Sequence, residues 1–247
     1  MIRETRINID GIPALQITCG DMPKGVVLFY HGWTSQKEYQ SVRGHLLAAY
    51  GYDVLIPEAV NHGERGPIDY NSPAAYGEFW QTVFQNIREA PSIIKYIRKW
   101  RRHVPCAVMG HSMGAFTALG VMTHYTEFRT AVALNGSGWW DESDRRFRAA
   151  LHIEKPRSYR VLAMQIQAMD PYAYTHKLAG RSVLALNGGA DDVVDNKAQE
   201  LYMEKLAKDS QVISRYGTYD GLGHFVTTNM MGDAVQWLDE ALAVPVR

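Results

Sequence analysis

A chain of 247 residues with 26 basic and 26 acidic side chains can bury one sizeable core and has no formal net charge. It contains no long run of one sign of charge, so we expect neither a nucleic acid nor a membrane surface as a partner. Apolar residues never run uninterrupted for about 18 positions, which argues against a membrane-spanning helix. The charged N-terminal residues lack the apolar core of a secretory signal. Cys19 and Cys106 lie in strand-like surroundings typical of reduced thiols, so we expect a cytoplasmic protein.

The first residues of the chain alternate apolar and polar side chains around Asp10-Gly11, which predicts an antiparallel hairpin. Solid apolar runs then alternate with helical stretches, a pattern typical of βαβ units around a mainly parallel sheet. We expect strands at 6–9, 14–18, 26–30, 54–57, 106–109, 131–134, 182–186 and 212–216. We expect helices at 38–50, 74–100 with a break near Pro91, 115–122, 196–208 and 233–243.

One polar, partly helical segment, residues 136–180, interrupts this alternation. The sequence contains no internal repeat, low-complexity segment or domain linker. We therefore expect a single domain over residues 1–247, in which 136–180 forms a small cap beside the functional site.

The pentapeptide Gly110-His111-Ser112-Met113-Gly114 stands where the apolar run 106–109 gives way to the helical run 115–122. The G-x-S-x-G pattern alone is weak evidence, because it arises by chance in roughly one chain in ten of this size. The strand-to-helix context is typical of a nucleophile elbow, in which a sharp turn lifts the serine hydroxyl clear of the sheet and glycines avoid steric collisions. Ser112 is therefore our candidate nucleophile.

A serine hydroxyl needs a base to take its proton and an acid to orient that base. His224 lies in a glycine-rich loop after the last predicted strand, where open α/β sheets assemble their sites. In the elbow motif the acid comes between serine and histidine in chain order. The turn 187–190 presents two adjacent carboxylates there. We prefer Asp191, the first residue after the turn, and keep Asp192 as the alternative.

Acyl transfer also needs N–H donors directed at the oxyanion. The elbow geometry assigns this role to the backbone amide of Met113 and to that of Trp33, in the loop after strand 26–30. The Trp33 side chain would either wall the pocket or pack in the core. His31 and His111, close to these two amides in sequence, are candidate pocket residues.

Two further clusters are candidates for substrate contact. His62 and Glu64 lie in the loop 61–66, but one histidine and one glutamate lack the ligand number of a zinc centre, so we expect no metal and no cofactor. We interpret this loop as the pocket rim, with His62 as a candidate contact. Trp139 and Trp140 would line the pocket or belong to the core.

With these motifs in order, the chain resembles the α/β-hydrolase superfamily over nearly its whole length. That resemblance implies an α/β-hydrolase fold, with a mainly parallel eight-stranded sheet and helices on both faces. It also implies a Ser112-His224-Asp191 triad that hydrolyses carboxylic esters through an acyl-enzyme.

A narrower resemblance is to small bacterial serine esterases of the dienelactone-hydrolase and prolyl-oligopeptidase-like branch. The stretches that carry it are 31–35, 57–59, 62–66 and Asp170-Pro171. Dienelactone hydrolases typically use a cysteine where Ser112 stands, and the chain has no room for the propeller domain of a prolyl oligopeptidase.

The sequence therefore predicts a serine hydrolase that cleaves small-molecule esters of short or medium acyl chain. A thioesterase or small peptidase with the same triad is the first alternative. A ligand-binding protein that has the fold without hydrolysis is the alternative from a different class.

Overall fold

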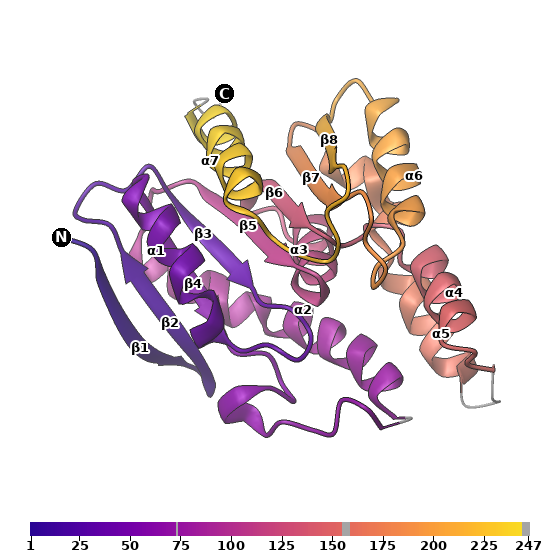
Figure 1. Cartoon of the computed structure of the whole chain (residues 1–247). Coiled ribbons are helices and arrows are strands. Elements are labelled where there is room, and N and C mark those ends of the chain that lie inside the picture. The colour runs from indigo at the N-terminus through magenta and orange to yellow at the C-terminus, as the bar shows by residue number, and fades with distance from the viewer. Residues whose placement is uncertain (73, 155–158, 244–247) are drawn as a thin grey trace.

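The computed structural model describes residues 1–72, 74–154 and 159–243, and within them eight strands form one sheet (Figure 1). The order across the sheet is β1-β2-β4-β3-β5-β6-β7-β8. The strands are β1 (Arg3–Ile9), β2 (Ile12–Thr18), β3 (Gly25–Tyr30), β4 (Tyr52–Pro57), β5 (Cys106–His111), β6 (Phe128–Leu134), β7 (Ser182–Gly188) and β8 (Ile213–Tyr219). The predicted mainly parallel sheet and α/β-hydrolase architecture are confirmed.

The sheet has an antiparallel edge and a parallel centre. β1 pairs with β2 as the predicted hairpin around Asp10-Gly11, and β2 pairs antiparallel with β4. From β4 to β8 every pairing is parallel. The strands β3, β4 and β7 are buried along their whole length, because helices cover both faces, whereas the edge strands β1 and β8 have exposed residues.

Helices form a layer on each face of the sheet. Buried side chains of α1 and α7, such as Leu47 and Leu238, fill the core on one face. Side chains of α2, α3 and α6, such as Phe84, Phe116 and Tyr202, fill the core on the other. In Figure 1, α1 and α7 lie in front of the sheet, with α2 and α3 behind it. The helices are α1 (Ser41–Ala49), α2 (Ala75–Trp100), α3 (Met113–His124), α4 (Trp140–Ala150), α5 (Tyr159–Met169), α6 (Asn196–Ala207) and α7 (Thr228–Ala243).

The predicted break of α2 near Pro91 is wrong, because the helix continues through the proline to Trp100. Proline removes the N–H that would bond to the carbonyl four residues earlier, which here belongs to Ile87. The Tyr125 hydroxyl, at the end of α3, donates a hydrogen bond to that carbonyl oxygen at 2.9 Å. A tertiary contact therefore satisfies the group that the proline leaves without its helical partner.

The final helix begins earlier than the predicted residue 233. It starts at Thr228, and the Thr227 hydroxyl accepts a hydrogen bond from the Met230 N–H at 3.2 Å. Threonine is a favoured N-cap residue, because its oxygen satisfies an N–H in the first turn.

The segment 136–180 contains α4, α5 and the 3₁₀ helix η3 (Pro171–Leu178). Residues 155–158 of this segment lie outside the described residues. α4 and α5 pack against each other beside α2, at the lower right of Figure 1. The role of this segment as a cap stays a prediction. Across the described ranges, no helix has both the length and the apolar character needed to cross a membrane.

Candidate active site

The turn between β5 and α3 has the backbone of a nucleophile elbow. Ser112 adopts φ 55° and ψ −123°, a conformation that a non-glycine residue rarely takes. A Cβ atom on Gly114 would lie 2.0 Å from the Tyr30 carbonyl oxygen, and one on Gly110 would lie 2.0 Å from the Gly114 carbonyl oxygen. Both flanking glycines are therefore required by close backbone approach. Ser112, at the start of α3, is 8% exposed.

The structure brings Ser112, His224 and Asp191 together from the ends of β5, β8 and β7. His224 Nε2 lies 2.9 Å from Ser112 Oγ, and His224 Nδ1 lies 2.7 Å from Asp191 Oδ2. The carboxyl ends of neighbouring parallel strands meet at one edge of the sheet, which explains the convergence. Asp192 is exposed, and its neighbour Asp191 is the carboxylate in contact with the imidazole.

The Asp191 carboxylate is held ionised beside the imidazole. Burial alone would raise its pKa, but hydrogen bonds from His224 and from the N–H groups of Val194 and Val193 outweigh burial and lower the pKa. Both N–H groups donate to Oδ1 at 2.9 Å, which leaves Oδ2 directed at Nδ1 of His224. A carboxylate fixed in this way orients the imidazole ring of His224.

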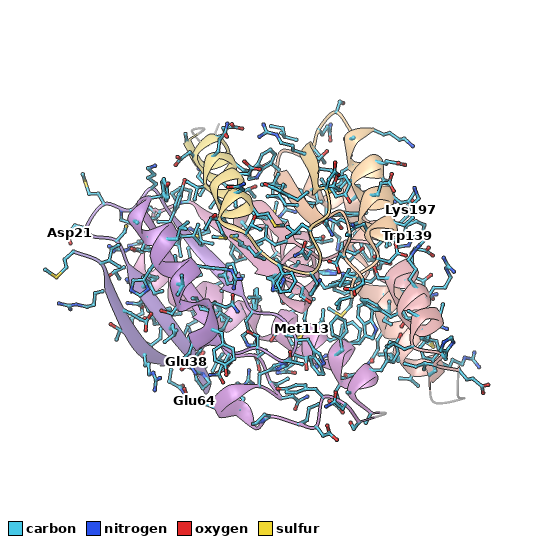
Figure 2. The ribbon with its side chains drawn as sticks, in the orientation of Figure 1. Asp21, Glu38, Glu64, Met113, Trp139 and Lys197 are labelled. Carbon is cyan, nitrogen blue, oxygen red and sulfur yellow. The ribbon has the colours of Figure 1, made fainter. Side chains whose placement is uncertain are left out.

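The loop after β3 lies against the elbow. A Cβ atom on Gly32 would come within 3.3 Å of both the His111 carbonyl oxygen and the Ser112 Cβ. Trp33 and Met113, the first residue of α3, therefore belong to two segments that contact each other at Ser112. Met113 is labelled near the centre of the molecule in Figure 2. The backbone amides of Trp33 and Met113 stay the predicted oxyanion-hole donors, and that of Met113 lies at a helix N-terminus.

His111 lies next to His224, with ring centroids 5.1 Å apart. Burial, followed by the proximity of His224, lowers the pKa of His111 to about 3. The ring is therefore neutral at neutral pH and adds no positive charge beside His224.

Three candidate pocket residues point into the interior, which corrects that part of the prediction. His31 is 1% exposed, with Nδ1 2.9 Å from the Gly32 carbonyl oxygen and Nε2 3.1 Å from the Ala59 backbone nitrogen. His62 is fully buried, and burial lowers its pKa to about 4. Trp140 is fully buried against Trp80, with ring centroids 5.8 Å apart. These three side chains have no exposed surface to offer a substrate. They pack in the interior instead.

Two of the candidate pocket residues, Trp33 and Trp139, remain partly exposed. Trp33 contacts the His62 and Tyr70 rings, with centroids 4.9 Å and 5.0 Å away. Trp139, labelled in Figure 2, stacks on Tyr172 with centroids 4.0 Å apart. Each of the two tryptophan rings therefore packs against other aromatic side chains and keeps part of its surface exposed.

Sequence reasoning missed a buried charge network that contacts the loop after β3 at His31. We call this loop, residues 31–34, the oxyanion loop after its predicted role. Lys37 Nζ lies 2.8 Å from Glu58 Oε2, and Glu58 Oε1 lies 3.2 Å from His31 Nε2. Glu38 and Glu64, which lie close together in Figure 2, also contact the Lys37 ammonium group. The one available signal was the position of Glu58 directly after a buried strand. No local pattern connects it to a lysine in the loop after β3.

Among the residues that the structure describes, no group of three or more His, Cys, Asp or Glu side chains is arranged to hold a metal ion.

Comparison with known proteins points in one direction. A family model described as serine aminopeptidase, S33 (Hydrolase_4) matches residues 21–179, a stretch that includes Ser112 and ends before Asp191 and His224. The chain is 30% identical over 181 residues to Esterase YjfP of Escherichia coli (strain K12), covering 70% of this chain and 71% of that protein. It is 29% identical over 205 residues to Putative esterase YitV of Bacillus subtilis (strain 168), covering 78% and 80%. The crystal structure of TT1662 from Thermus thermophilus shares the fold, with a TM-score of 0.82, 22% identity and coverage of 99% and 100%.

Proposed function

The chain belongs to the Hydrolase_4 family (serine aminopeptidase, S33), and from this premise we propose that it is a serine esterase with Ser112 as nucleophile, His224 as base and Asp191 as acid. The observation that carries the proposal is the imidazole of His224, which lies within hydrogen-bond reach of both Ser112 Oγ and Asp191 Oδ2. The names of two relatives, an esterase and a putative esterase, support ester hydrolysis as the reaction.

In the proposed reaction, Ser112 Oγ attacks the ester carbonyl carbon while His224 Nε2 takes the hydroxyl proton. The carbonyl oxygen becomes an oxyanion, which the amides of Trp33 and Met113 stabilise. His224 then gives its proton to the departing alkoxide, and an acyl-enzyme on Ser112 remains. A water molecule repeats the sequence, with His224 again as base and then as acid, and releases the carboxylic acid.

The proposal extends to the surroundings of the triad. We propose that the segment 136–180 acts as a cap, because Trp139 and Tyr172 stack within it and are partly exposed. Apolar walls of this kind suit esters of short or medium acyl chain. A cytoplasmic location remains part of the proposal and rests on the sequence alone.

Turnover of nitrophenyl esters by the purified protein tests the proposal. Ser112→Ala and His224→Ala should each reduce kcat by about 10⁴-fold or more, and the double variant should lose little beyond either single variant, because the two groups act as a unit. Ser182→Ala is a matched control, because Ser182 is 7% exposed and is the first residue of β7, at the end of the strand away from Asp191. Unchanged turnover in Ser112→Ala would exclude this serine as the nucleophile.

The family description also favours a peptidase as the second candidate. The same acyl-enzyme chemistry would cleave an amide. Comparison of kcat/KM for an ester, an acyl-CoA thioester and an aminoacyl amide with the same acyl group separates the esterase, thioesterase and peptidase functions. We expect the ester to be preferred.

A further inference from the structure

Asn135 occupies the position between the three loops that carry the triad. It is the first residue after β6, which lies between β5 and β7 in the sheet, and its side chain is fully buried. The preceding carbonyl, that of Leu134, accepts a hydrogen bond from the Ser112 N–H at 2.9 Å. The end of β6 is therefore already bonded to the nucleophile through the backbone.

The Asn135 amide group bonds to the other two loops at the same time. Its Oδ1 accepts a hydrogen bond from the Gly188 N–H at 2.8 Å, at the start of the turn that presents Asp191. Its Nδ2 donates a hydrogen bond to the carbonyl oxygen of Phe225 at 2.8 Å, one residue after His224. One planar side chain thus holds the acid loop with its acceptor and the base loop with its donor.

The backbone at this position explains why asparagine fits. Asn135 adopts φ 52°, in the left-handed region where asparagine is several-fold enriched among non-glycine residues. Aspartate would tolerate the same backbone but has no donor when ionised, and serine is too short to reach both loops. Glycine would keep the backbone and remove both hydrogen bonds.

The two loops also bond to each other, which defines what Asn135 adds. The Ala190 N–H donates to the Leu222 carbonyl oxygen at 2.8 Å, so the acid and base loops can keep their mutual distance without Asn135. That bond does not fix the pair relative to Ser112. Asn135 connects the pair to the strand end that receives the Ser112 N–H.

We propose that Asn135 is a positioning residue that holds the Asp191–His224 pair in register with Ser112. This inference rests on the proposed function of the triad. Its consequence is a distance change between His224 Nε2 and Ser112 Oγ when the amide is removed, with the His224–Asp191 contact preserved. A misplacement of about 1 Å between reacting groups costs about 100-fold in rate.

The test compares Asn135→Gly with Thr130→Val. Thr130 is a matched control on the same strand: it is fully buried, and its hydroxyl donates to the Ser182 carbonyl oxygen at 3.1 Å and accepts from Trp237 Nε1 at 2.7 Å. It lies at the opposite end of β6 from the triad. Both substitutions remove two buried hydrogen bonds, and only Asn135→Gly removes bonds to the triad loops.

Steady-state kinetics well below the melting temperature of each variant, with active sites counted by a fluorophosphonate, give kcat per folded site. We expect Asn135→Gly to lower kcat about 100-fold with little change in KM, and to slow the labelling of Ser112 in parallel, while Thr130→Val keeps the wild-type kcat. If Asn135→Gly does not fold, Asn135→Ser replaces it in the same measurements.

Two results would overturn the inference. One is a kcat for the Asn135 variant equal to that of Thr130→Val at matched stability, and the other is a loss confined to KM. Failure of the proposed function is a separate result: the wild-type protein would then turn over no ester and would not be labelled at Ser112.

Discussion

Lys37 and Glu58 form an ion pair that solvent does not reach, with Nζ 2.8 Å from Oε2 and side-chain exposures of 1% and 0%. A second buried carboxylate, Asp53, lies at the opposite end of β4 and pairs with Arg101 at 2.6 Å. Buried carboxylates in ion pairs therefore stand at both ends of β4, with Asp53 inside the strand and Glu58 directly after it, next to the oxyanion loop. The Arg101–Asp53 pair is therefore an internal control for the first prediction.

Lys37→Met should destabilise the protein by about 3–5 kcal/mol, because it leaves the Glu58 carboxylate buried without its ammonium partner. Arg101→Met should also destabilise the protein, because it leaves Asp53 unpaired. Only Lys37→Met should also lower kcat, since Glu58 contacts His31 in the oxyanion loop. Urea unfolding and ester kinetics on both variants measure these effects. Equal kcat values in the two variants would show that the Lys37–Glu58 ion pair has no specific effect on the oxyanion loop.

We predict that the Glu58 carboxyl makes the free energy of unfolding fall at acidic pH. Burial alone would raise its pKa, but hydrogen bonds with His31 and Lys37 outweigh burial and lower the pKa from 4.5 to about 2. A depressed pKa means that the contribution is complete above about pH 4.5 and is lost as the pH falls toward 2. This difference between the two pKa values corresponds to about 3 kcal/mol of unfolding free energy.

Glu58→Gln should therefore flatten the dependence of unfolding free energy on pH between 2 and 5, although it lowers stability at neutral pH. Urea unfolding at a series of pH values measures the slope. A slope identical to that of the wild-type protein would show that other carboxylates cause the loss of stability at acidic pH.

Adjacent carboxylates give a direct test of the triad acid. Asp191→Asn should lower kcat by about 10⁴-fold, because the His224 ring loses the acceptor that fixes its tautomer. Asp192→Asn should change kcat little, since that side chain is exposed. Ester kinetics per active site distinguish the two, and a larger loss in Asp192→Asn would reverse the assignment.

Substitution of two helical glycines by alanine should change the stability of the protein in opposite directions. In Gly114→Ala the new methyl group would lie 2.0 Å from the Tyr30 carbonyl oxygen, so we expect a destabilisation of about 1–3 kcal/mol or more. Gly77 in α2 has no atom within 4 Å of that position, so Gly77→Ala should stabilise the protein by about 0.5–1 kcal/mol. Thermal unfolding measures both. Stabilisation by Gly114→Ala would contradict the packing of the elbow against β3.

Tyr125 and Pro91 should be coupled, although Pro91 lies in α2 and Tyr125 directly follows α3. Tyr125→Phe should cost about 1–3 kcal/mol, because the Ile87 carbonyl oxygen loses its hydrogen bond. In a Pro91→Ala background the alanine N–H can bond to that carbonyl, so the cost of Tyr125→Phe should fall. A double-mutant cycle in urea measures the coupling, and additive effects would refute it.

Much of the fold followed from local patterns. Solid apolar runs identified the central strands, and Asp10-Gly11 between alternating residues identified the hairpin, because side-chain periodicity depends directly on backbone geometry. The helix through Pro91 could not be predicted in this way. Its continuity depends on a hydroxyl from Tyr125, 34 positions later, and no local pattern records such a contact.

The sequence by itself determined the sheet, the strand-to-helix turn at Ser112 and the order of serine, acid and histidine along the chain. Only the tertiary structure decided which of Asp191 and Asp192 contacts His224, and that His62 and Trp140 face inward. It also decided that Asn135 bonds to two loops at once. The physical reason is that local backbone preferences act over a few residues, whereas burial, ion pairing and side-chain register depend on segments that meet only when the sheet has formed.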